Sequence, residues 1–165
     1  MTNLDILAEE VFVERTEPLP WSGCLIWTGP LTHNGYGTMC VGGKDLRAHR
    51  YAWERERGPI PEGMQVDHVC WNRLCCEVSH LRLATPAQNQ ANRSGARRDS
   101  GTGVRNVYAT PAGTFQVRMT ANGVRRQFGN YSTLAEAARV AEIRRAEMFG
   151  EFAGKQERQL LAQGA

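Results

Sequence analysis

Three cysteines and a histidine are spaced along the chain as the ligands of a metal ion would be. Cys70 and Cys75 are separated by four residues, and His80 follows Cys75 after four more. Zinc in proteins prefers tetrahedral coordination by nitrogen and sulfur, and a structural site needs a fourth ligand to close it. Cys24, which lies 46 residues before Cys70, is the best candidate. The sequence therefore predicts a structural zinc site formed by Cys24, Cys70, Cys75 and His80.

The remaining two cysteines leave this ligand set open. Cys76 could replace Cys75, and Cys40 could replace Cys24, although each is expected to be a buried free thiol. The chain has no basic or apolar leader, so a reducing compartment is expected and disulfides are not. A core in which all five cysteines are simple thiols is less favoured, because three cysteines within seven positions beside two histidines are hard to explain by packing.

Asp67, His68 and Asn89 flank the metal motif with side chains that suit phosphodiester hydrolysis. A hydrolytic nuclease needs a base to activate water, and a divalent cation to neutralise charge on the scissile phosphate and the leaving oxygen. Histidine, with an ordinary pKa of about 6.5, is available as a neutral base at neutral pH. Aspartate and asparagine supply the oxygen ligands that Mg²⁺ accepts. His68 and Asn89 would face each other across a phosphate-sized gap if their strand and helix pack together.

Short strands and helices are expected around these residues. Apolar periodicity and turn signals place them at residues 3–14 (helix), 25–27 and 35–41 (strands), 48–57 (helix), 64–69 and 81–84 (strands) and 86–93 (helix). The first two strands are expected to pair through a turn at residues 32–35, and Gly42-Gly43 turns the chain again. Thr85 is the expected N-cap of the last helix, with Pro86 at its first position.

A second module is expected after a linker at residues 94–103, which is rich in glycine and serine. Three short strands, at residues 104–109, 114–120 and 124–128, precede a helix at 134–149 that Thr133 and Glu136 cap. The order predicts a three-stranded antiparallel sheet with one helix packed across it. The tail at residues 154–165 is expected to fray.

Positive charge is concentrated in the middle of the chain. Residues 91–131 hold seven arginines against Asp99 alone, whereas the whole chain has a net charge of +3. This distribution is the electrostatic footprint of a protein that binds a phosphate backbone. An arginine-rich surface that is merely solvated is the alternative. No secretory leader or membrane span is visible, so we expect a cytoplasmic protein without a membrane partner.

The segment DHVCWNRLCCEVSHLRLATPAQNQANR resembles the core of the HNH endonucleases, and most of all their zinc-stapled His-Cys box homing branch. GCLIWTG, NGYG and AHRYAWERERGPIPEG resemble zinc-containing HNH proteins of phages, so the likeness covers about residues 20–93. It implies a ββα-metal fold with His68 as general base and with Asp67 and Asn89 as ligands of Mg²⁺ or Mn²⁺. It also implies structural zinc on the four ligands named above.

The chain departs from that pattern at the metal loop. The family usually reads Cys-Val-Asn-Pro-x-His where this chain has Cys75-Cys76-Glu77-Val78-Ser79-His80. In zinc-free members the residue at the place of His80 orients the catalytic histidine, so His80 could have that role instead. The resemblance also suggests an arginine near the scissile phosphate, for which Arg47 and Arg50 are candidates.

The segment that begins GVRNVYATPAG resembles the ethylene-response-factor type DNA-binding domain, whose three-stranded sheet enters the major groove. By position, the resemblance implies five DNA-facing side chains, which are Arg105, Gln116, Arg118, Arg125 and Arg126. Three arginines of the helix, Arg139, Arg144 and Arg145, are expected to be solvated. A basic sheet–helix scaffold that reads no bases is the alternative.

The sequence thus predicts an α+β protein with four parts. They are an HNH endonuclease domain at 1–93 (core 20–93), a linker at 94–103, an ethylene-response-factor type DNA-binding domain at 104–153 and a tail at 154–165. The expected function is a Mg²⁺-dependent endonuclease of phage or homing type. It would nick or cut double-stranded DNA in a bacterial host's cytoplasm, as a monomer or homodimer. The alternatives are a non-catalytic zinc-stapled DNA-binding regulator and a redox or metal sensor that uses the vicinal thiols of the metal loop.

Overall fold

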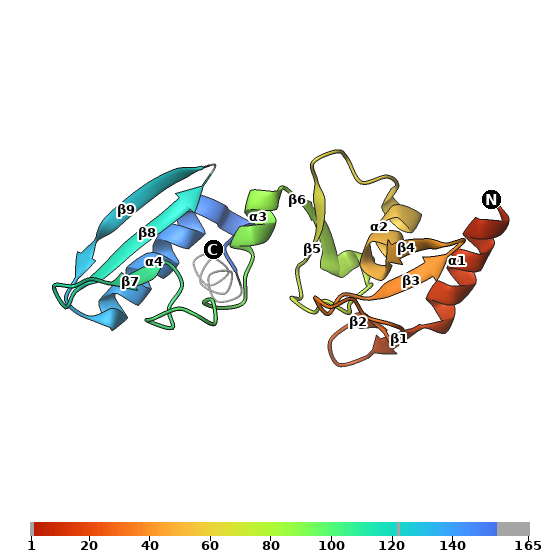
Figure 1. Cartoon of the computed structure of the whole chain (residues 1–165), viewed down its shortest axis with the longest axis horizontal. Coiled ribbons are helices and arrows are strands. Elements are labelled where there is room, and N and C mark those ends of the chain that lie inside the picture. The colour runs from red at the N-terminus through yellow and green to blue at the C-terminus, as the bar shows by residue number, and fades with distance from the viewer. Residues whose placement is uncertain (1, 122, 155–165) are drawn as a thin grey trace. The chain divides into compact units, whose positions relative to one another are not determined.

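The computed structural model describes residues 2–121 and 123–154 of the chain, which divides after Thr85 into two compact units (Figure 1). Both units combine helices with antiparallel strands, as the predicted α+β class requires. Apart from Gly154, the predicted tail lies outside the described residues. Within them, no helix has the length and apolar character needed to cross a membrane.

The first unit is built from two helices, six short strands and a 3₁₀ turn. In order these are α1 (Asn3–Glu14), β1 (Thr16–Leu19), β2 (Cys24–Trp27), β3 (Thr38–Val41), β4 (Lys44–Arg47), α2 (Ala48–Arg57), β5 (Gln65–His68), η1 (Val78–His80) and β6 (Leu81–Ala84). The strands form three two-stranded antiparallel sheets, β1-β2, β3-β4 and β5-β6. Both helices have the predicted bounds.

The predicted pairing of the strands at 25–27 and 35–41 is wrong. Strand β2 pairs with β1, and β3 pairs with β4. The glycines explain the second hairpin: Gly42 and Gly43 have φ of 57° and 76°, and two successive positive φ angles form the tight turn that suits twisted strands. The loop at residues 28–37 instead closes on itself through a bridge between Leu31 and Gly37.

Trp27 lies at the centre of the first unit's core and is only 1% exposed. Phe12 of α1 packs against it, with ring centroids 6.3 Å apart. Gly37 approaches the indole so closely that a Cβ there would lie 2.6 Å from the ring, so a side chain cannot be accommodated. The Trp27 main-chain N–H donates to the Leu74 carbonyl at 2.8 Å. The buried strand β2 is therefore joined directly to the cysteine-rich loop.

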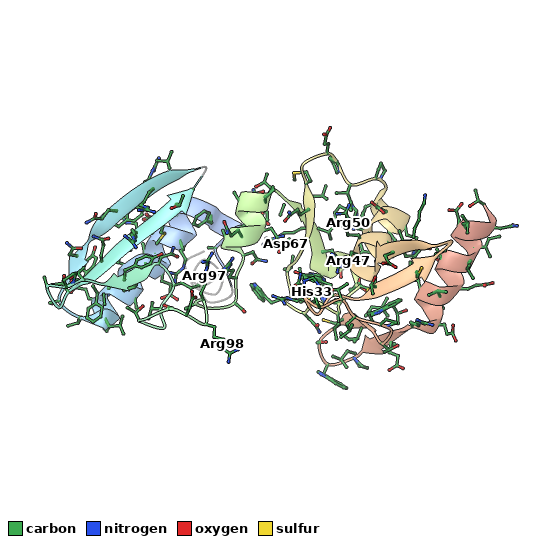
Figure 2. The ribbon with its side chains drawn as sticks, viewed as in Figure 1. His33, Arg47, Arg50, Asp67, Arg97 and Arg98 are labelled. Carbon is green, nitrogen blue, oxygen red and sulfur yellow. The ribbon has the colours of Figure 1, made fainter. Side chains whose placement is uncertain are left out.

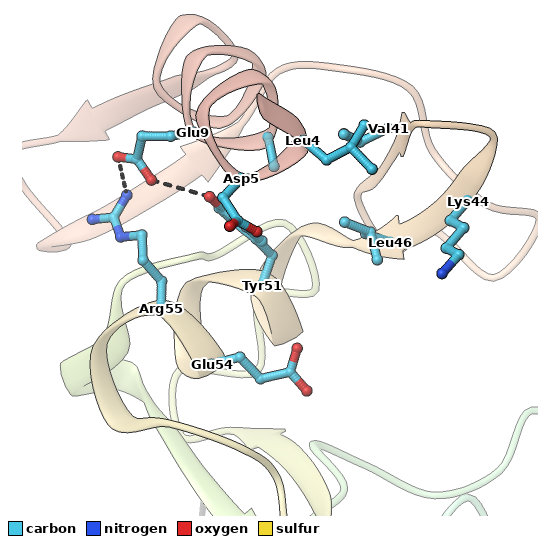
Figure 3. Close-up of a pocket in the computed structure, with 10 residues that line it drawn as sticks. Leu4, Asp5, Glu9, Val41, Lys44, Leu46, Tyr51, Glu54 and Arg55 are labelled. Carbon is cyan, nitrogen blue, oxygen red and sulfur yellow. Dashed lines mark hydrogen bonds and ion pairs between the residues drawn. The ribbon is translucent and has the colours of Figure 1, made fainter. Parts of the chain in front are cut away.

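Helices α1 and α2 are joined by Glu9 (Figure 3). Its carboxylate accepts hydrogen bonds from Arg55 at 3.0 Å and from the Tyr51 hydroxyl at 3.1 Å. Burial, together with the hydrogen bond to Glu9, raises the pKa of Tyr51 to about 12, so this phenol remains a donor. These contacts fix α2, whose first turn reaches the candidate site.

The second unit contains the predicted three-stranded antiparallel sheet with one helix against it. Its elements are α3 (Pro86–Ala91), β7 (Val107–Ala109), β8 (Phe115–Ala121), β9 (Val124–Tyr131), α4 (Leu134–Phe149) and η2 (Gly150–Phe152), with strand order β7-β8-β9. Buried side chains of the sheet and α4 form its core. Strand β7 begins later than predicted, after Asn106 with its left-handed φ of 64°. Residue 122 of the predicted Asn-Gly turn lies outside the described residues.

Two arginines form a structural network in the second unit. Arg145 was expected to be solvated but is only 4% exposed, and it donates to the Arg105 carbonyl at 2.8 Å. The Arg105 guanidinium donates to the carbonyls of Ala91 at 2.6 Å, Arg93 at 2.8 Å and Ala153 at 3.1 Å. A guanidinium has five N–H donors and can therefore join several chain segments. This network explains why α3 belongs to the second unit.

Candidate functional site: a Cys3His cluster beside a buried histidine

Four side chains with sulfur and nitrogen ligand atoms meet in the first unit. Cys24 begins β2, Cys70 and Cys75 lie in the loop after β5, and His80 ends η1. Their ligand atoms all lie within 4.8 Å of one another. His80 Nδ1 is 3.4 Å from Cys24 Sγ and 3.6 Å from Cys75 Sγ, while sulfur and nitrogen ligands of one tetrahedral zinc ion lie about 3.6 Å apart. The cluster therefore has the donors and the dimensions of a Cys3His metal site.

The two cysteines considered as alternative ligands lie outside this cluster. Cys40 is exposed on β3. Cys76 is part of the apolar core, and burial raises the pKa of its thiol to about 12. Its main-chain N–H donates to the Leu25 carbonyl at 2.7 Å. Cys76, the cysteine that the family pattern lacks, thus anchors the metal loop to β2 through its main chain.

A shared proton links Cys70 and Cys75. The hydrogen bond between their sulfur atoms lowers the pKa of Cys70 to about 5 and raises the pKa of Cys75. The thiolate is the form of cysteine that binds a metal. The pairing of the two thiols therefore favours the metal-binding thiolate form at Cys70.

His68, the last residue of β5, is only 6% exposed. Its Nε2 lies 3.1 Å from the Cys75 carbonyl oxygen. Because a carbonyl can only accept, Nε2 carries the proton and Nδ1 carries the lone pair. Burial is the main cause of the lowered pKa of His68, and it favours the neutral ring that a base needs. His80, the alternative for orienting His68, instead has its Nδ1 against sulfur.

Asp67 is held by an arginine that the sequence analysis missed. Strands β5 and β6 place Arg82 directly opposite Asp67, and Arg82 Nε donates to Asp67 Oδ2 at 2.9 Å. The carboxylate is only 4% exposed. A charge-assisted hydrogen bond of this kind fixes the orientation of the carboxylate. The cross-strand register could have identified Arg82 once the pairing of β5 with β6 was assumed.

Two further rings pack against His68. Its centroid lies 4.8 Å from that of His49 in α2 and 6.0 Å from that of Tyr36, and the His49 and Tyr36 centroids are 5.3 Å apart. The Arg73 guanidinium lies over the Tyr36 ring, 5.4 Å from its centroid, and donates to the Asn34 carbonyl at 2.8 Å. The sequence analysis assigned no role to Tyr36 or His49, because only the packing of three separate segments brings them to His68.

The two candidate phosphate-binding arginines differ in their surroundings. Figure 2 marks Arg47 and Arg50 near the start of α2. Arg50 is exposed, whereas Arg47 is half-buried. Arg47 Nη1 is buried and has no hydrogen-bond partner among the described residues. Arg47 is therefore the candidate with a buried donor available for a ligand.

Residues 46–91 match the HNH endonuclease family. The chain contains an HNH endonuclease domain. The matched segment runs from β4 through α3 and includes Asp67, His68 and Asn89.

Relatives of this chain occur in viruses. Protein 7.7 of Escherichia phage T7 is 42% identical over 66 residues, which cover 40% of this chain and 51% of that protein. An uncharacterized HNH endonuclease, L560, of Acanthamoeba polyphaga mimivirus is 33% identical over 124 residues, which cover 74% of this chain and 63% of that protein. Protein 3.8 of phage T7 is 31% identical over 111 residues, 67% of this chain and 90% of that protein. The chain thus spans about half the length of protein 7.7. No solved structure matches the chain.

The HNH match continues past the end of the first compact unit. Asn89 lies half-buried on α3, and the two units divide between Thr85 and Pro86. The predicted domain boundary at residue 93, which was placed by the composition of the linker that follows it, is later than this division. The chain thus places Asp67 and His68 in one unit and Asn89 in the other.

Three of the side chains predicted to face DNA lie on one face of the second unit's sheet. Gln116 and Arg118 alternate along β8 with buried residues, so they face away from α4. Arg125 pairs with Thr120, on the same face. The Arg118 guanidinium lies 3.9 Å from the centroid of the Tyr108 ring. This open face of the sheet is polar and basic. We define it by Tyr108, Gln116, Arg118, Thr120 and Arg125.

The other two predicted side chains are placed differently. The Arg105 guanidinium is engaged with the three main-chain carbonyls of the network described above. Arg126 is exposed but pairs with Met119, which is buried against α4. Arg126 therefore belongs to the opposite face of the sheet.

Proposed function

We propose that this chain is a Mg²⁺- or Mn²⁺-dependent DNA endonuclease of phage or homing type, in which His68 is the general base. The observation that carries the proposal is the hydrogen bond from His68 Nε2 to the Cys75 carbonyl at 3.1 Å. Cys75 also contributes its sulfur to the Cys3His cluster. A metal in the cluster, which we propose to be zinc, would therefore fix the orientation of the base.

The residues of the site divide the steps of hydrolysis among them. His68 Nδ1 takes a proton from water, and the water oxygen attacks the phosphorus atom. The bond from phosphorus to the 3′ oxygen breaks, which leaves a 5′-phosphate and a 3′-hydroxyl protonated from solvent. Asp67, oriented by Arg82, and Asn89 are the residues we propose to hold a divalent cation, which would neutralise charge on the phosphate and leaving oxygen. Arg47 is the arginine we propose for the scissile phosphate.

Nicking of a supercoiled plasmid tests this proposal. With Mg²⁺, the wild-type protein is expected to nick, while Asp67→Ala and Asn89→Ala slow nicking by about 100-fold or more, because each removes an oxygen ligand of the cation. Gln90→Ala, at an exposed position of the same helix α3, is the matched control and should leave the rate unchanged. Wild-type protein that shifts the plasmid in a gel but never nicks it contradicts the proposal. That result favours the alternative function, a non-catalytic DNA-binding regulator whose fold is stabilised by zinc.

We further propose that the second unit targets the nuclease to double-stranded DNA through the open face of its sheet. The support is the grouping of Gln116, Arg118 and Arg125 on a face that α4 does not cover. Arg118 stacks on Tyr108, which reduces the conformational freedom it would lose on binding. The viral relatives favour a phage-encoded enzyme that acts in its host's cytoplasm. One protomer would nick a single strand, and a homodimer would cut both.

Arg118→Ala is expected to weaken binding to duplex DNA. If Arg118 reads a base, the binding free energy should fall by about 1–3 kcal/mol, and the preference for one base at one position of the DNA site should be lost. If Arg118 contacts a phosphate, the slope of log affinity against log salt concentration should become shallower by about one. Fluorescence anisotropy in a His68→Ala background, at several salt concentrations, measures both. Arg139→Ala, exposed on α4, is the control. The targeting role is contradicted if Arg139→Ala weakens binding and Arg118→Ala does not.

A further inference from the structure

His49 is a buried histidine beside the proposed general base and has no role in the mechanism above. It is 7% exposed, and its ring centroid is 4.8 Å from that of His68. Its Nδ1 is buried and has no hydrogen-bond partner among the described residues. A buried polar atom without a partner costs free energy, and in a native protein it indicates a missing ligand, ion or water.

Packing alone does not explain a histidine at this position. Burial, assisted by repulsion from the protonated form of His68 and from Arg50 and Arg47, lowers the pKa of His49 to about 3, so the ring is uncharged at neutral pH. A neutral imidazole offers one donor and one acceptor. The ring contacts with Tyr36 and His68 need neither, and a phenyl ring would make them without burying a polar atom. The choice of histidine therefore points to a hydrogen bond with a bound group.

The surroundings of His49 indicate the charge of that group. Two residues earlier, Arg47 Nη1 is likewise buried without a partner among the described residues. Arg47 is the N-cap of the ten-residue helix α2 and makes no side-chain capping bond. The N-terminus of a helix favours an anion, and arginine and N–H donors together bind phosphate oxygens. The two buried polar atoms thus flank the start of a helix at a position suited to a phosphate.

Given the nuclease function proposed above, on which this inference rests, we propose that His49 is a second active-site histidine. Its imidazole donates a hydrogen bond from Nδ1 to an oxygen of the DNA phosphate that Arg47 binds beside His68. The two histidines then have separate tasks: His68 takes the proton from water, and His49 holds the phosphate. Both buried donors, His49 Nδ1 and Arg47 Nη1, gain a partner when DNA binds.

Three substitutions at position 49 distinguish the effect of losing this hydrogen bond from the effect of losing the packing of the ring. His49→Phe keeps a planar ring without polar atoms, His49→Asn places an amide nitrogen near the position of Nδ1, and His49→Ala removes both. Each full-length variant is measured for zinc content, Tm and the rate of plasmid nicking with Mg²⁺. Affinity for a DNA duplex is measured without divalent cation.

The Phe variant is expected to retain zinc and to have the same Tm as wild type or a higher one, because a buried unpartnered atom has been removed. Its nicking should nevertheless be about 10- to 100-fold slower, and its DNA affinity lower, as expected for the loss of a hydrogen bond to a charged group. The Asn variant should nick faster than both the Phe and Ala variants. This combination of unchanged stability and lost activity is not expected of a residue that only packs.

A Phe variant that nicks at the wild-type rate overturns the inference and leaves His49 as a packing residue. If the Phe variant does not fold, equal nicking rates of the Asn and Ala variants overturn it instead. A wild-type protein that binds DNA without nicking overturns the proposed nuclease function. In that case the phosphate contact is judged by DNA affinity, and an unchanged affinity of the Phe variant overturns it as well.

Discussion

His68→Ala is expected to slow DNA cleavage by about 100- to 10,000-fold, the range that a positioned general base contributes. The variant lacks the Nδ1 lone pair that the bond from Nε2 to the Cys75 carbonyl holds in place. Because the metal ligands are untouched, the variant should retain its zinc, and its DNA affinity should be close to that of wild type. Single-turnover nicking of a supercoiled plasmid with excess protein measures the chemical step separately from binding.

His33→Ala is the matched control for this experiment, since His33 is exposed on the loop between β2 and β3. We expect it to nick at the wild-type rate. A His68→Ala variant that cleaves as fast as this control would remove His68 from the mechanism. Retained zinc content in both variants excludes unfolding as the reason for any loss.

Cys70→Ser is expected to lose the bound zinc and, with it, the folded first unit. Structural zinc binding contributes about 10–16 kcal/mol in small zinc modules, which equals or exceeds the total stability of about 5–15 kcal/mol typical of a domain. The cluster joins the start of β2 to the loop after β5, so its loss removes the side-chain part of a connection that otherwise rests on main-chain hydrogen bonds. Elemental analysis should give about one zinc per chain for wild type and none for the variant.

Tryptophan fluorescence can follow this unfolding in one unit alone, because all four tryptophans lie in residues 1–85. The emission of Cys70→Ser should shift towards that of the unfolded chain, while far-ultraviolet circular dichroism retains the contribution of the second unit. Cys40→Ser, at an exposed cysteine outside the cluster, is the control and should bind zinc normally. A Cys70→Ser protein with native emission would show that the cluster does not stabilise the fold.

The sequence predicted best those elements whose ends or ligands are determined by residues close together in the chain. The helix at residues 134–149 was predicted to its ends, because Thr133 accepts from the Glu136 N–H as an N-cap and Gly150 follows the last residue. The spacing of Cys70, Cys75 and His80 also indicated three residues of the cluster, since metal ligands are few in type and these lie in one loop. The fourth, Cys24, was the best candidate and had Cys40 as its alternative. Local patterns of this kind do not depend on which segments pack together.

What the sequence did not predict depends on pairing between distant segments. Alternating residues indicated strands at 25–27 and 35–41 but not their partners, and the partners β1 and β4 carry charged residues and little apolar pattern. Arg82 became visible only as the residue opposite Asp67. His49 and Arg145 resembled ordinary polar residues of helices, and only packing shows both to be buried.

The most direct test of the central claim is cleavage of a DNA duplex in water enriched in ¹⁸O, with Mg²⁺ present, followed by mass spectrometry of the new ends. If water activated by His68 attacks the phosphate, each cut leaves a 3′-hydroxyl and a 5′-phosphate that carries one ¹⁸O atom. Uncut duplex, in a sample that holds its zinc and binds the DNA, would contradict the account. So would new ends in which the phosphate lacks the label or remains on the 3′ side.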